Sequence, residues 1–372
     1  MATFMSKVVG QMTHRERLFE AAHKRTPDMI PVWPYMVNYN ARQWNISMRL
    51  YNTDPIFTAK GELASFYKHR QDGIGGFRFV GQGACEMGAK VLIQEDLEPL
   101  WDQDNLRVKD LVKDTETLEV PDPYTAGPFM SLVTSSNQMV IEEVRRRGID
   151  VRLHGRVMGP FTVATFLRGI EASMFDIVER PSEYKKLTKI CTQTEIVFGK
   201  AQIDTGATTP WISEPNSNSD FISAKDWDEF VLPTLQACHG AWHEHGADWT
   251  MQHQCGDSTM NRDSLAKSGC DTVYPDSWKW LPIHEYVAAI GKKVCLGLSL
   301  EITDTLLLGT PEDCKEEGKQ LAWMYGPKQQ ANKSACIFTS GCEIAPDMPD
   351  ENLDEMVHAP KEFGVYPIKP KW

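Results

Sequence analysis

Lys293-Val294-Cys295-Leu296-Gly297-Leu298 is a short apolar segment, and two further stretches complete the unit that it begins. Pro311–Tyr325 follows with apolar residues at the spacing of a helix, and Cys336-Ile337-Phe338-Thr339 is a second short apolar segment. A buried parallel strand typically shows a continuous apolar run, and a helix usually connects it to the next parallel strand. The unit therefore predicts strand, helix and strand in a parallel sheet.

The same unit recurs along most of the chain, where short apolar segments ending in Gly, Pro, Asn or Asp alternate with helix-period stretches. The predicted strands are Ile30–Tyr35, Gly75–Val80, Val151–His154, Thr208–Ser213, Trp249–Gln252, Thr272–Tyr274, Lys293–Leu298 and Cys336–Thr339. The predicted helices are Arg15–His23, Met174–Val178, Pro181–Ile203, Asp226–His245, Asn261–Ser268, Ile283–Ile290, Pro311–Tyr325 and Asp350–His358. About eight repeats predict an α/β fold of the (β/α)8 TIM-barrel type rather than an open sheet.

Residues 82–140 interrupt this alternation with acidic segments that contain proline, such as Glu95-Asp96-Leu97-Glu98-Pro99 and Val120-Pro121-Asp122-Pro123. We interpret this region as an insertion, or lid, over the barrel mouth. The chain has no Gly/Ser linker, internal repeat or low-complexity tract that would divide it. Residues 1–372 are therefore expected to form a single barrel domain.

Composition excludes several classes of protein. The 372 residues are 41% hydrophobic and 24% charged, proportions at which a chain buries a large core. A net charge of −12 repels nucleic acid and anionic membranes. The nine Cys are odd in number and scattered, which favours a reducing compartment over a disulfide framework. Because no transmembrane run or signal-peptide pattern is found, we expect a cytoplasmic protein with no nucleic-acid or membrane partner.

Two cysteines and a histidine form the strongest candidate site. His253 and Cys255 are two residues apart directly after a predicted strand, so both side chains point the same way. Cys342 follows the last predicted strand in a similar position, and the carboxyl ends of barrel strands are where active sites form. One imidazole and two thiolates are a good set for zinc with one open position, as catalytic zinc requires.

The spacing of these three residues in the sequence also allows interpretations other than a metal site. His253 can equally be a hydrogen-bonded core residue, with the two cysteines as small apolar fillers. A rival pair, His243 and His245, can chelate a metal, but it ends a predicted helix at the amino-terminal face of the barrel, which usually serves stability. Motifs for a Walker A loop, a dinucleotide fold, a serine-hydrolase elbow and a zinc-protease helix are absent from the sequence.

Glu214 and several aromatic residues also lie at or just beyond predicted strand ends. Glu214 is in a position to complete a metal shell, take a proton or orient a ligand; the alternative is a solvated loop acid or a partner of a helix N-terminus. Aromatic residues at strand ends suit a planar ligand, although core packing explains any one of them equally well. These aromatic residues are Trp33, Tyr35, Tyr39, Phe79, Trp211, Trp278 and Trp280.

Three stretches resemble the uroporphyrinogen decarboxylase superfamily, and within it the branch of corrinoid-dependent methyltransferases. They are Gly159–Ala164 (GPFTVA), His253–Gly256 (HQCG) and Ser340–Asp347 (SGCEIAPD), the last followed by Pro349 and Glu351–Leu353. A weaker match is Gly309–Asp313. The likeness covers most of residues 13–365, and the last stretch is the most specific because it is similar to the closing Gly-Cys-x-x-x-Pro-x-x-Pro-x-x-Asn segment of these methyltransferases.

This resemblance implies a (β/α)8 barrel, zinc held by His253, Cys255 and Cys342, and a cobalamin-type corrinoid carried by a partner protein. Uroporphyrinogen decarboxylase itself is disfavoured, because its Arg-Gln-Ala-Gly-Arg-Tyr segment is missing where this chain has Pro34–Tyr39. Glu214 stands where many relatives carry Asp-Pro, which leaves its role in doubt.

Two directions of methyl transfer fit this branch. In one, a methylated substrate gives its methyl group to the Co(I) of the corrinoid protein; in the other, the methylated corrinoid gives it to a thiol such as coenzyme M. The length of the chain and its aromatic residues favour the first direction, with an aromatic methyl ether as substrate. A barrel that binds a corrinoid or tetrapyrrole without turnover is a further alternative, and the sequence leaves a homo-oligomer open.

For transfer from an aromatic methyl ether, Glu214 is the predicted catalytic residue, which protonates or orients the leaving oxygen. Trp33, Tyr35 and Trp211 are the candidates for packing against the substrate ring. Asn38 and Tyr39 are the candidates for polar contacts with the substrate.

Overall fold

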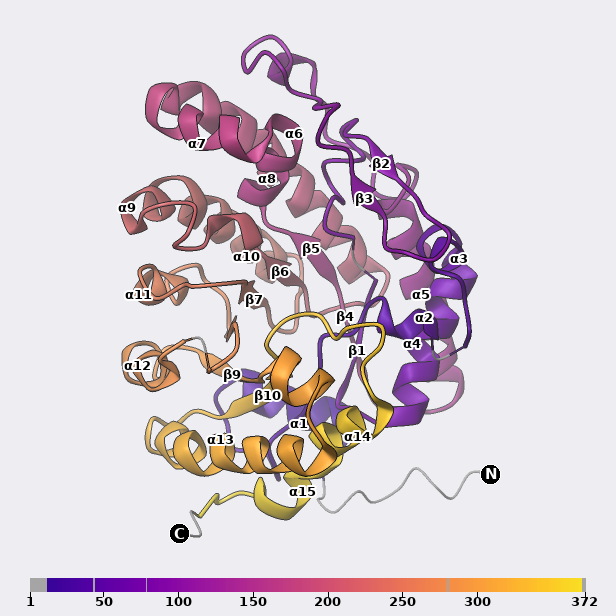
Figure 1. Cartoon of the computed structure of the whole chain (residues 1–372), viewed down its shortest axis with the longest axis vertical. Coiled ribbons are helices and arrows are strands. Elements are labelled where there is room, and N and C mark those ends of the chain that lie inside the picture. Colours follow the sequence, from indigo (N-terminus) through magenta and orange to yellow (C-terminus); the bar gives the residue numbers. More distant parts are fainter. Residues whose placement is uncertain (1–11, 43, 78, 280, 370–372) are drawn as a thin grey trace.

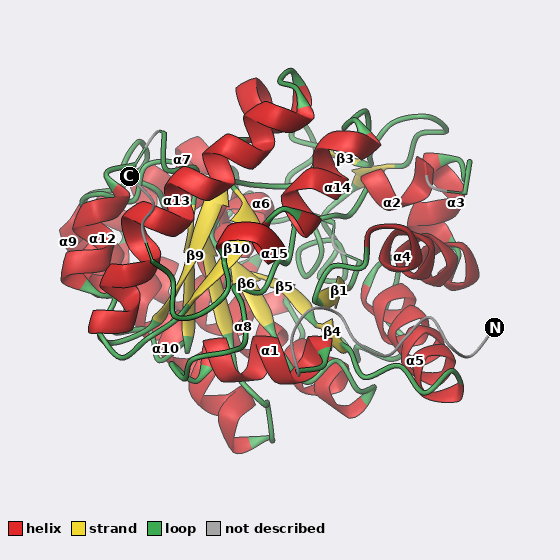
Figure 2. Cartoon of the chain, turned by 90° about the horizontal axis from the view of Figure 1, so that it is seen from below, coloured by secondary structure: helices red, strands yellow, loops and turns green. Residues whose placement is uncertain are grey.

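The computed structural model describes residues 12–42, 44–77, 79–279 and 281–369, and its strands lie at the centre of the molecule with helices around them (Figures 1 and 2). The main sheet is parallel and has the order β10-β9-β8-β7-β6-β5. Its strands are β5 (Arg156–Met158), β6 (Trp211–Ser213), β7 (Met251–Gln254), β8 (Thr272–Pro275), β9 (Cys295–Leu300) and β10 (Cys336–Ser340). A second parallel pair consists of β1 (Gly73–Gly75) and β4 (Arg152–His154).

The two sheets form one closed ring. β4 ends at His154 and β5 begins at Arg156, so a single barrel strand takes part in both sheets. At the other edge β10 forms a parallel bridge between Phe338 and Val32. The N–H of Asp72, directly before β1, donates to the carbonyl oxygen of Val32 at 2.8 Å. The pairings therefore return to their starting point, and the predicted (β/α)8 barrel is confirmed.

The first barrel strand is much shorter than predicted. Ile30–Tyr35 was expected to be a strand, but only the bridge at Val32 forms there. The N–H of Trp33 donates to Phe338 at 2.8 Å, and the flanking Pro31 and Pro34 have no N–H to donate. Because proline cannot extend a hydrogen-bonded ladder, pairing with β10 stops after this bridge.

The second barrel strand was predicted at Gly75–Val80, but β1 spans Gly73–Gly75, so the prediction is correct only at Gly75. A Cβ atom at Gly73 would lie 2.4 Å from Nε2 of His154, and one at Gly75 would lie 2.0 Å from Nη2 of Arg156. The large side chains of His154 and Arg156 thus occupy the space that a Cβ atom on β1 would need, and only glycine can stand at Gly73 and Gly75 without a clash. An apolar pattern cannot indicate a strand of this kind.

Helices form the outer layer, and each predicted helix has an observed counterpart. These are α1 (His14–Ala22), α7 (Ile170–Glu179), α8 (Pro181–Asp204), α9 (Ala224–Asp226) continued by η3 (Trp227–Val231) and α10 (Leu232–Glu244), α11 (Arg262–Leu265), α12 (Ile283–Ala289), α13 (Pro311–Ala331) and α14 (Asp350–His358). In α1 the capping box of Thr13 and Glu16 is present.

Other helices were not predicted. They are α2 (Tyr39–Arg42), α3 (Met48–Thr53), α4 (Pro55–His69), α5 (Met130–Arg146), α6 (Pro160–Arg168) and α15 (Pro360–Phe363), with the 3-10 turns η1 (Thr115–Thr117) and η2 (Pro215–Ser217) and the π-helix η4 (Ile302–Leu307). The start of α4 has a readable signal, because Asp54 accepts a hydrogen bond from the N–H of Ile56 and Pro55 occupies the first helical position.

Residues 82–140 contain an antiparallel hairpin of β2 (Val91–Leu92) and β3 (Leu100–Trp101), the turn η1 and the first part of α5. The ring of Trp101 packs edge-on against Phe166 of α6, with centroids 4.8 Å apart. Because α6 directly follows the carboxyl end of β5, the hairpin lies beside the barrel mouth. α5 packs against α4 and α8 in the helical layer.

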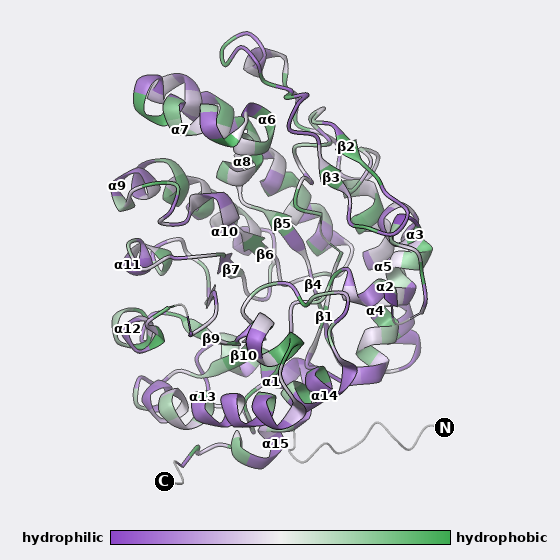
Figure 3. Ribbon diagram, in the orientation of Figure 1, coloured by the Kyte–Doolittle hydropathy of each residue, from purple (hydrophilic) through white to green (hydrophobic). Residues whose placement is uncertain are grey.

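Burial follows the amphipathic pattern of the sequence. Purple and green segments alternate along the outer helices in Figure 3, as expected where one face of a helix covers a core. Large side chains such as Trp227, Trp242 and Trp249 are fully buried. Within the described residues, no helix combines the length and the apolar character needed to cross a bilayer.

Candidate functional site

His253 is fixed in place by strand pairing and by its own ring. It lies in β7 between Ser213 of β6 and Tyr274 of β8, and its side chain is fully buried. Nδ1 donates to the carbonyl oxygen of Tyr274 at 2.9 Å. A carbonyl only accepts hydrogen bonds, so the proton is on Nδ1 and the lone pair of Nε2 is available to a ligand.

Cys255 and Cys342 meet this nitrogen. Nε2 of His253 is 2.9 Å from Sγ of Cys255, which is 3.7 Å from Sγ of Cys342. The three atoms lie within 4.8 Å of one another, and they form the one group of His, Cys, Asp or Glu that could hold a metal ion among the residues that the structure describes. The structure thus brings together three residues that the sequence places up to 89 positions apart.

The geometry of this cluster fits zinc. Tetrahedral zinc with bonds of about 2.3 Å to sulfur and about 2.0 Å to nitrogen places two sulfurs about 3.8 Å apart, and a nitrogen and a sulfur about 3.5 Å apart. The observed Sγ–Sγ distance of 3.7 Å matches the first value. The observed Nε2–Sγ distance of 2.9 Å is shorter, as expected when a hydrogen bond joins the two atoms. A small separation of His253 and Cys255 suffices to admit the ion.

The thiols are the accessible part of the site. Cys255 and Cys342 are partly exposed, whereas the other seven cysteines are buried. The neighbouring Cys255 thiol, together with the ring of His253, holds the pKa of the Cys342 thiol well below its usual value, against the raising effect of burial. Both features suit thiolate ligands that face an open position.

Asp276 is a residue of the site that the sequence analysis missed. It follows β8 directly, and its Oδ2 accepts from the N–H of Gly256 at 2.8 Å. Burial raises the pKa of its carboxyl group, which also interacts electrostatically with His253 and Cys342. Carboxylates are zinc ligands or partners of zinc ligands in many proteins, so Asp276 belongs to the candidate site. Its position directly after a strand end is the signal that could have indicated it.

Tyr35 and Trp211 form a wall beside His253. The rings of Trp211 and His253 are stacked with centroids 5.4 Å apart, and Tyr35 lies 4.7 Å from Trp211 and 6.3 Å from His253. Behind this wall the guanidinium of Arg156 lies 4.2 Å from the centroid of Tyr35 and 5.3 Å from that of Trp211. Trp33 is one layer farther in and packs against His154 at 4.0 Å.

Asn38 and Tyr39 contact the chain around Cys342. The backbone N–H and Nδ2 of Asn38 both donate to Oε1 of Glu343 at 3.0 Å. The hydroxyl of Tyr39 donates to Asp350 at 2.5 Å and lies 2.7 Å from Nε2 of His69.

Glu214 follows β6, and its carboxylate binds the first turn of α6. It accepts from the N–H groups of Phe161 and Thr162 at 3.0 Å each, and from the hydroxyl of Thr162 at 2.6 Å. Burial raises its pKa to about 7 against the lowering effect of these hydrogen bonds. The side chain therefore holds α6 against the end of β6.

The remaining candidates lie apart from the cluster. His243 and His245 at the end of α10 contact Asp271 and Asp204 at 3.3 and 2.9 Å respectively. Trp278 donates from Nε1 to Glu317 at 2.7 Å. Phe79 packs against Phe129 at 4.5 Å, and Trp280 lies outside the described residues.

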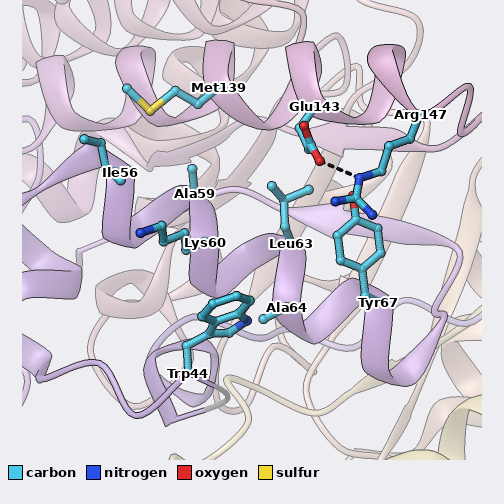
Figure 4. A pocket seen from close by; sticks show the side chains of 10 residues that line it. All are labelled: Trp44, Ile56, Ala59, Lys60, Leu63, Ala64, Tyr67, Met139, Glu143 and Arg147. Atoms are coloured by element: carbon cyan, nitrogen blue, oxygen red, sulfur yellow. Dashed lines mark hydrogen bonds and ion pairs between the residues drawn. The ribbon is translucent and has the colours of Figure 1, made fainter.

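A surface pocket lies elsewhere, between α4 and α5 (Figure 4). Leu63 and Met139 contribute apolar surface, and Glu143 and Arg147 form an ion pair at one end. The pocket contains none of the three clustered ligands and no other thiol or imidazole. Its lining residues are Trp44, Ile56, Ala59, Lys60, Leu63, Ala64, Tyr67, Met139, Glu143 and Arg147.

Comparisons with known proteins agree with this architecture. The family model described as uroporphyrinogen decarboxylase (URO-D) matches residues 13–363. A methylcobamide:CoM methyltransferase of Methanosarcina acetivorans is 23% identical over 257 residues, 69% of this chain and 71% of the relative. A methylated-thiol–coenzyme M methyltransferase of Methanosarcina mazei is 27% identical over 206 residues, 55% of this chain and 52% of the relative. The solved structure of a methyltransferase from Methanosarcina mazei superposes with a TM-score of 0.82 at 22% identity, covering 95% of this chain and 99% of that chain.

Proposed function

The chain belongs to the uroporphyrinogen decarboxylase family, and from this premise we propose that it is a zinc-dependent methyltransferase that exchanges a methyl group with a corrinoid. The single observation that supports this most strongly is the cluster of His253, Cys255 and Cys342 at the carboxyl ends of β7 and β10. Relatives named as methylcobamide:CoM methyltransferases support the corrinoid, which we expect to be carried by a partner protein.

In this proposal His253, Cys255 and Cys342 hold the ion, and Asp276 lies beside them. Zinc at this position supplies a Lewis acid that stabilises negative charge on an oxygen or sulfur atom. The chain itself positions the ligands. The hydrogen bond from Nδ1 of His253 to Tyr274 fixes the imidazole ring, and Asp276 fixes the backbone after Cys255.

For the small substrate we propose an aromatic methyl ether, which loses its methyl group to a Co(I) corrinoid. The bond between the methyl carbon and the ether oxygen breaks, the electron pair of Co(I) forms the new bond to carbon, and the oxygen leaves with the electrons of the broken bond. Tyr35 and Trp211 are fully buried and pack against the ring of His253, so they give the site an apolar support from inside the barrel.

A second candidate substrate is a thiol that receives the methyl group. The observation in its favour is that relatives of this chain carry names of enzymes acting on coenzyme M. The same cluster suits it, because zinc stabilises a thiolate at neutral pH.

Glu214 as the proton donor to the leaving oxygen stays a prediction. Its three hydrogen bonds to α6 support a positioning role, and its raised pKa of about 7 supports a group that exchanges a proton near neutrality. Glu214→Gln separates the two roles, because Gln does not titrate and keeps an acceptor oxygen for one of the two N–H groups of α6, although its amide nitrogen cannot accept from the other. If Glu214 donates the proton, the variant should lose the step near pH 7 in the pH profile of the methyl-transfer rate. If Glu214 only positions α6, that profile should stay unchanged.

The proposed function is tested by anaerobic visible spectroscopy of the zinc-loaded protein with a Co(I) corrinoid. Methoxylated benzoates, methanol, methylamines and methyl sulfides are added one at a time. We expect the Co(I) band to disappear and the band of the methylated corrinoid to grow with a methoxylated benzoate. Demethylation of a methylated corrinoid by a thiol, with no reaction of any methyl donor, would establish the second candidate. No methyl transfer in either direction would overturn the proposed function.

A further inference from the structure

The three clustered residues are held in different ways. His253 lies within β7, and Cys255 is one residue beyond the end of that strand, which pairs with β6 and β8 on its two sides. Cys342 instead lies in residues 341–349, a connection without helix or strand between β10 and α14. Strand pairing therefore fixes His253 and Cys255. At Cys342 it reaches only the preceding residue, because the N–H of Gly341 donates to the carbonyl oxygen of Leu300 at 2.9 Å. The rest of the connection depends on contacts with other parts of the chain.

Most of these contacts come from one short segment after the first barrel strand. The N–H of Ile344 donates to the carbonyl oxygen of Tyr35 at 2.7 Å. The N–H of Tyr35 donates to Oγ of Ser340 at 3.0 Å, and this hydroxyl donates to the carbonyl oxygen of Cys342 at 2.7 Å. One backbone bond and two bonds of the Ser340 hydroxyl thus hold the residues on both sides of Cys342 against Tyr35.

Side chains of the same segment continue the attachment along the connection. Asn38 donates twice to Glu343, the neighbour of Cys342. Arg42 forms an ion pair with Asp347, and Tyr39 donates to Asp350, the first residue of α14.

The network extends one layer farther into the helical shell. His69, at the end of α4, lies 2.7 Å from the hydroxyl of Tyr39 through Nε2 and 2.7 Å from Asp354 of α14 through Nδ1. His69 is fully buried, whereas its partner Asp354 is partly exposed, so this link between α4 and α14 runs from the interior to the surface. The start of α14 is therefore held on the same side as the connection that precedes it.

We infer that the segment Tyr35–Arg42 is an anchor that sets the position of Cys342, and that Asn38 is its central positioning residue. This inference rests on the proposed function, because it assigns the anchor to the third ligand of the same site. It gives Asn38 and Tyr39 a different task from the substrate contacts that the sequence suggested. Asn38 is 4% exposed and faces the residue next to Cys342, which agrees with a structural partner of the ligand.

The test is Asn38→Asp, which keeps the size of the side chain, removes the Nδ2 donor and places a carboxylate against Glu343. Zinc affinity is measured by competition with a chromophoric chelator. We expect the affinity to fall roughly tenfold, the lower end of the range for lost partners of metal ligands. The double variant Asn38→Asp with Glu343→Gln restores a donor opposite the new carboxylate, and we expect it to recover most of the loss.

A second readout uses the metal-free protein. Cys255 and Cys342 are the two partly exposed cysteines, so a thiol reagent followed by peptide mapping gives their separate labelling rates. Asn38→Asp should raise the rate at Cys342 several-fold and leave the rate at Cys255 unchanged. Asn52→Asp is the matched control, because Asn52 is also buried but donates to Met48 within α3. The control should change neither rate.

Three results would overturn the inference. They are unchanged zinc affinity and labelling in Asn38→Asp, equal acceleration at both cysteines, or a double variant that recovers nothing. If methyl transfer then shows a raised KM at unchanged zinc affinity, Asn38 contacts substrate and the proposed function stands. Loss of the proposed function itself is distinguishable, because the parent protein would then fail to bind zinc or to transfer methyl groups. Should Asn38→Asp not fold, Glu343→Ala removes the same contact from a partly exposed side chain and is measured in the same way.

Discussion

The two sides of the barrel fill their interior differently. On the side of β6 to β10, strands pair regularly, and β9 and β10 are six and five residues long and fully buried. On the side of Val32, β1 and β4, pairing is reduced to a single bridge and two three-residue strands. We call these the regular side and the glycine side, because β1 has the sequence Gly-Ile-Gly.

The regular side carries the ligands, and the glycine side carries buried polar side chains. Gly73 and Gly75 leave room for His154 and Arg156, which are fully buried inside the barrel. The wall of Tyr35 and Trp211 lies between Arg156 and His253. Regular strand pairing therefore positions the ligands, whereas the missing Cβ atoms of Gly73 and Gly75 leave space for a buried cation behind the site.

The largest expected effect is on the regular side. Cys342→Ser replaces a thiolate with a hydroxyl that binds zinc poorly, so we expect loss of the zinc and a decrease of at least a hundredfold in methyl transfer. Metal content and transfer rate are measured on the same preparation. Cys270→Ser is the control, since Cys270 is buried away from the cluster. A zinc-loaded, fully active Cys342→Ser variant would contradict the assignment of the ligand.

The glycine side is tested by Gly73→Ala. The new Cβ would lie 2.4 Å from Nε2 of His154 and 3.0 Å from Cδ1 of Trp33, two rings that have little room to move. We expect a loss of about 3 kcal/mol in the free energy of unfolding, measured by urea denaturation.

Gly240→Ala is its matched control. A Cβ there meets no atom within 4 Å, and the residue lies within α10, so we expect a gain of up to ~1 kcal/mol. Equal effects at the two glycines would show that β1 does not need glycine to seat His154.

A smaller effect is expected from the charge near Arg156. Burial raises the pKa of Glu62 to about 8, against the lowering effect of Arg156. Because the folded state holds this proton more tightly than the unfolded state, the contribution of Glu62 to stability is complete below about pH 4.5 and is lost as pH rises through about 8.

Glu62→Gln removes this titration and keeps an oxygen for the hydroxyl of Tyr51, which donates at 2.8 Å. Relative to the parent, the variant should gain about 2.5 kcal/mol between pH 5 and pH 7, measured by urea denaturation at both values. A difference that does not change with pH would mean that Glu62 is ionised throughout.

How far the sequence predicts this structure can be seen at particular residues. His253 and Cys255 were predictable, because the i, i+2 spacing after an apolar strand fixes both direction and place. β1 was not, because its two glycines leave room for His154 and Arg156 instead of forming an apolar run, and the strand is defined by its pairing with β4. The contact of Asn38 with Glu343 spans 305 residues, and no local pattern in either segment indicates it. Glu214 was predicted at the right strand end, but its contacts with α6 depend on which way that strand faces.

The most direct test of the central claim is X-ray absorption spectroscopy at the zinc edge of the purified, zinc-loaded protein. The cluster of His253, Cys255 and Cys342 predicts two sulfur ligands at about 2.3 Å, with the rest of the shell made of nitrogen or oxygen at about 2.0 to 2.2 Å. The same measurement on Cys342→Ser should show at most one sulfur. A zinc shell without sulfur in the parent protein would contradict the account.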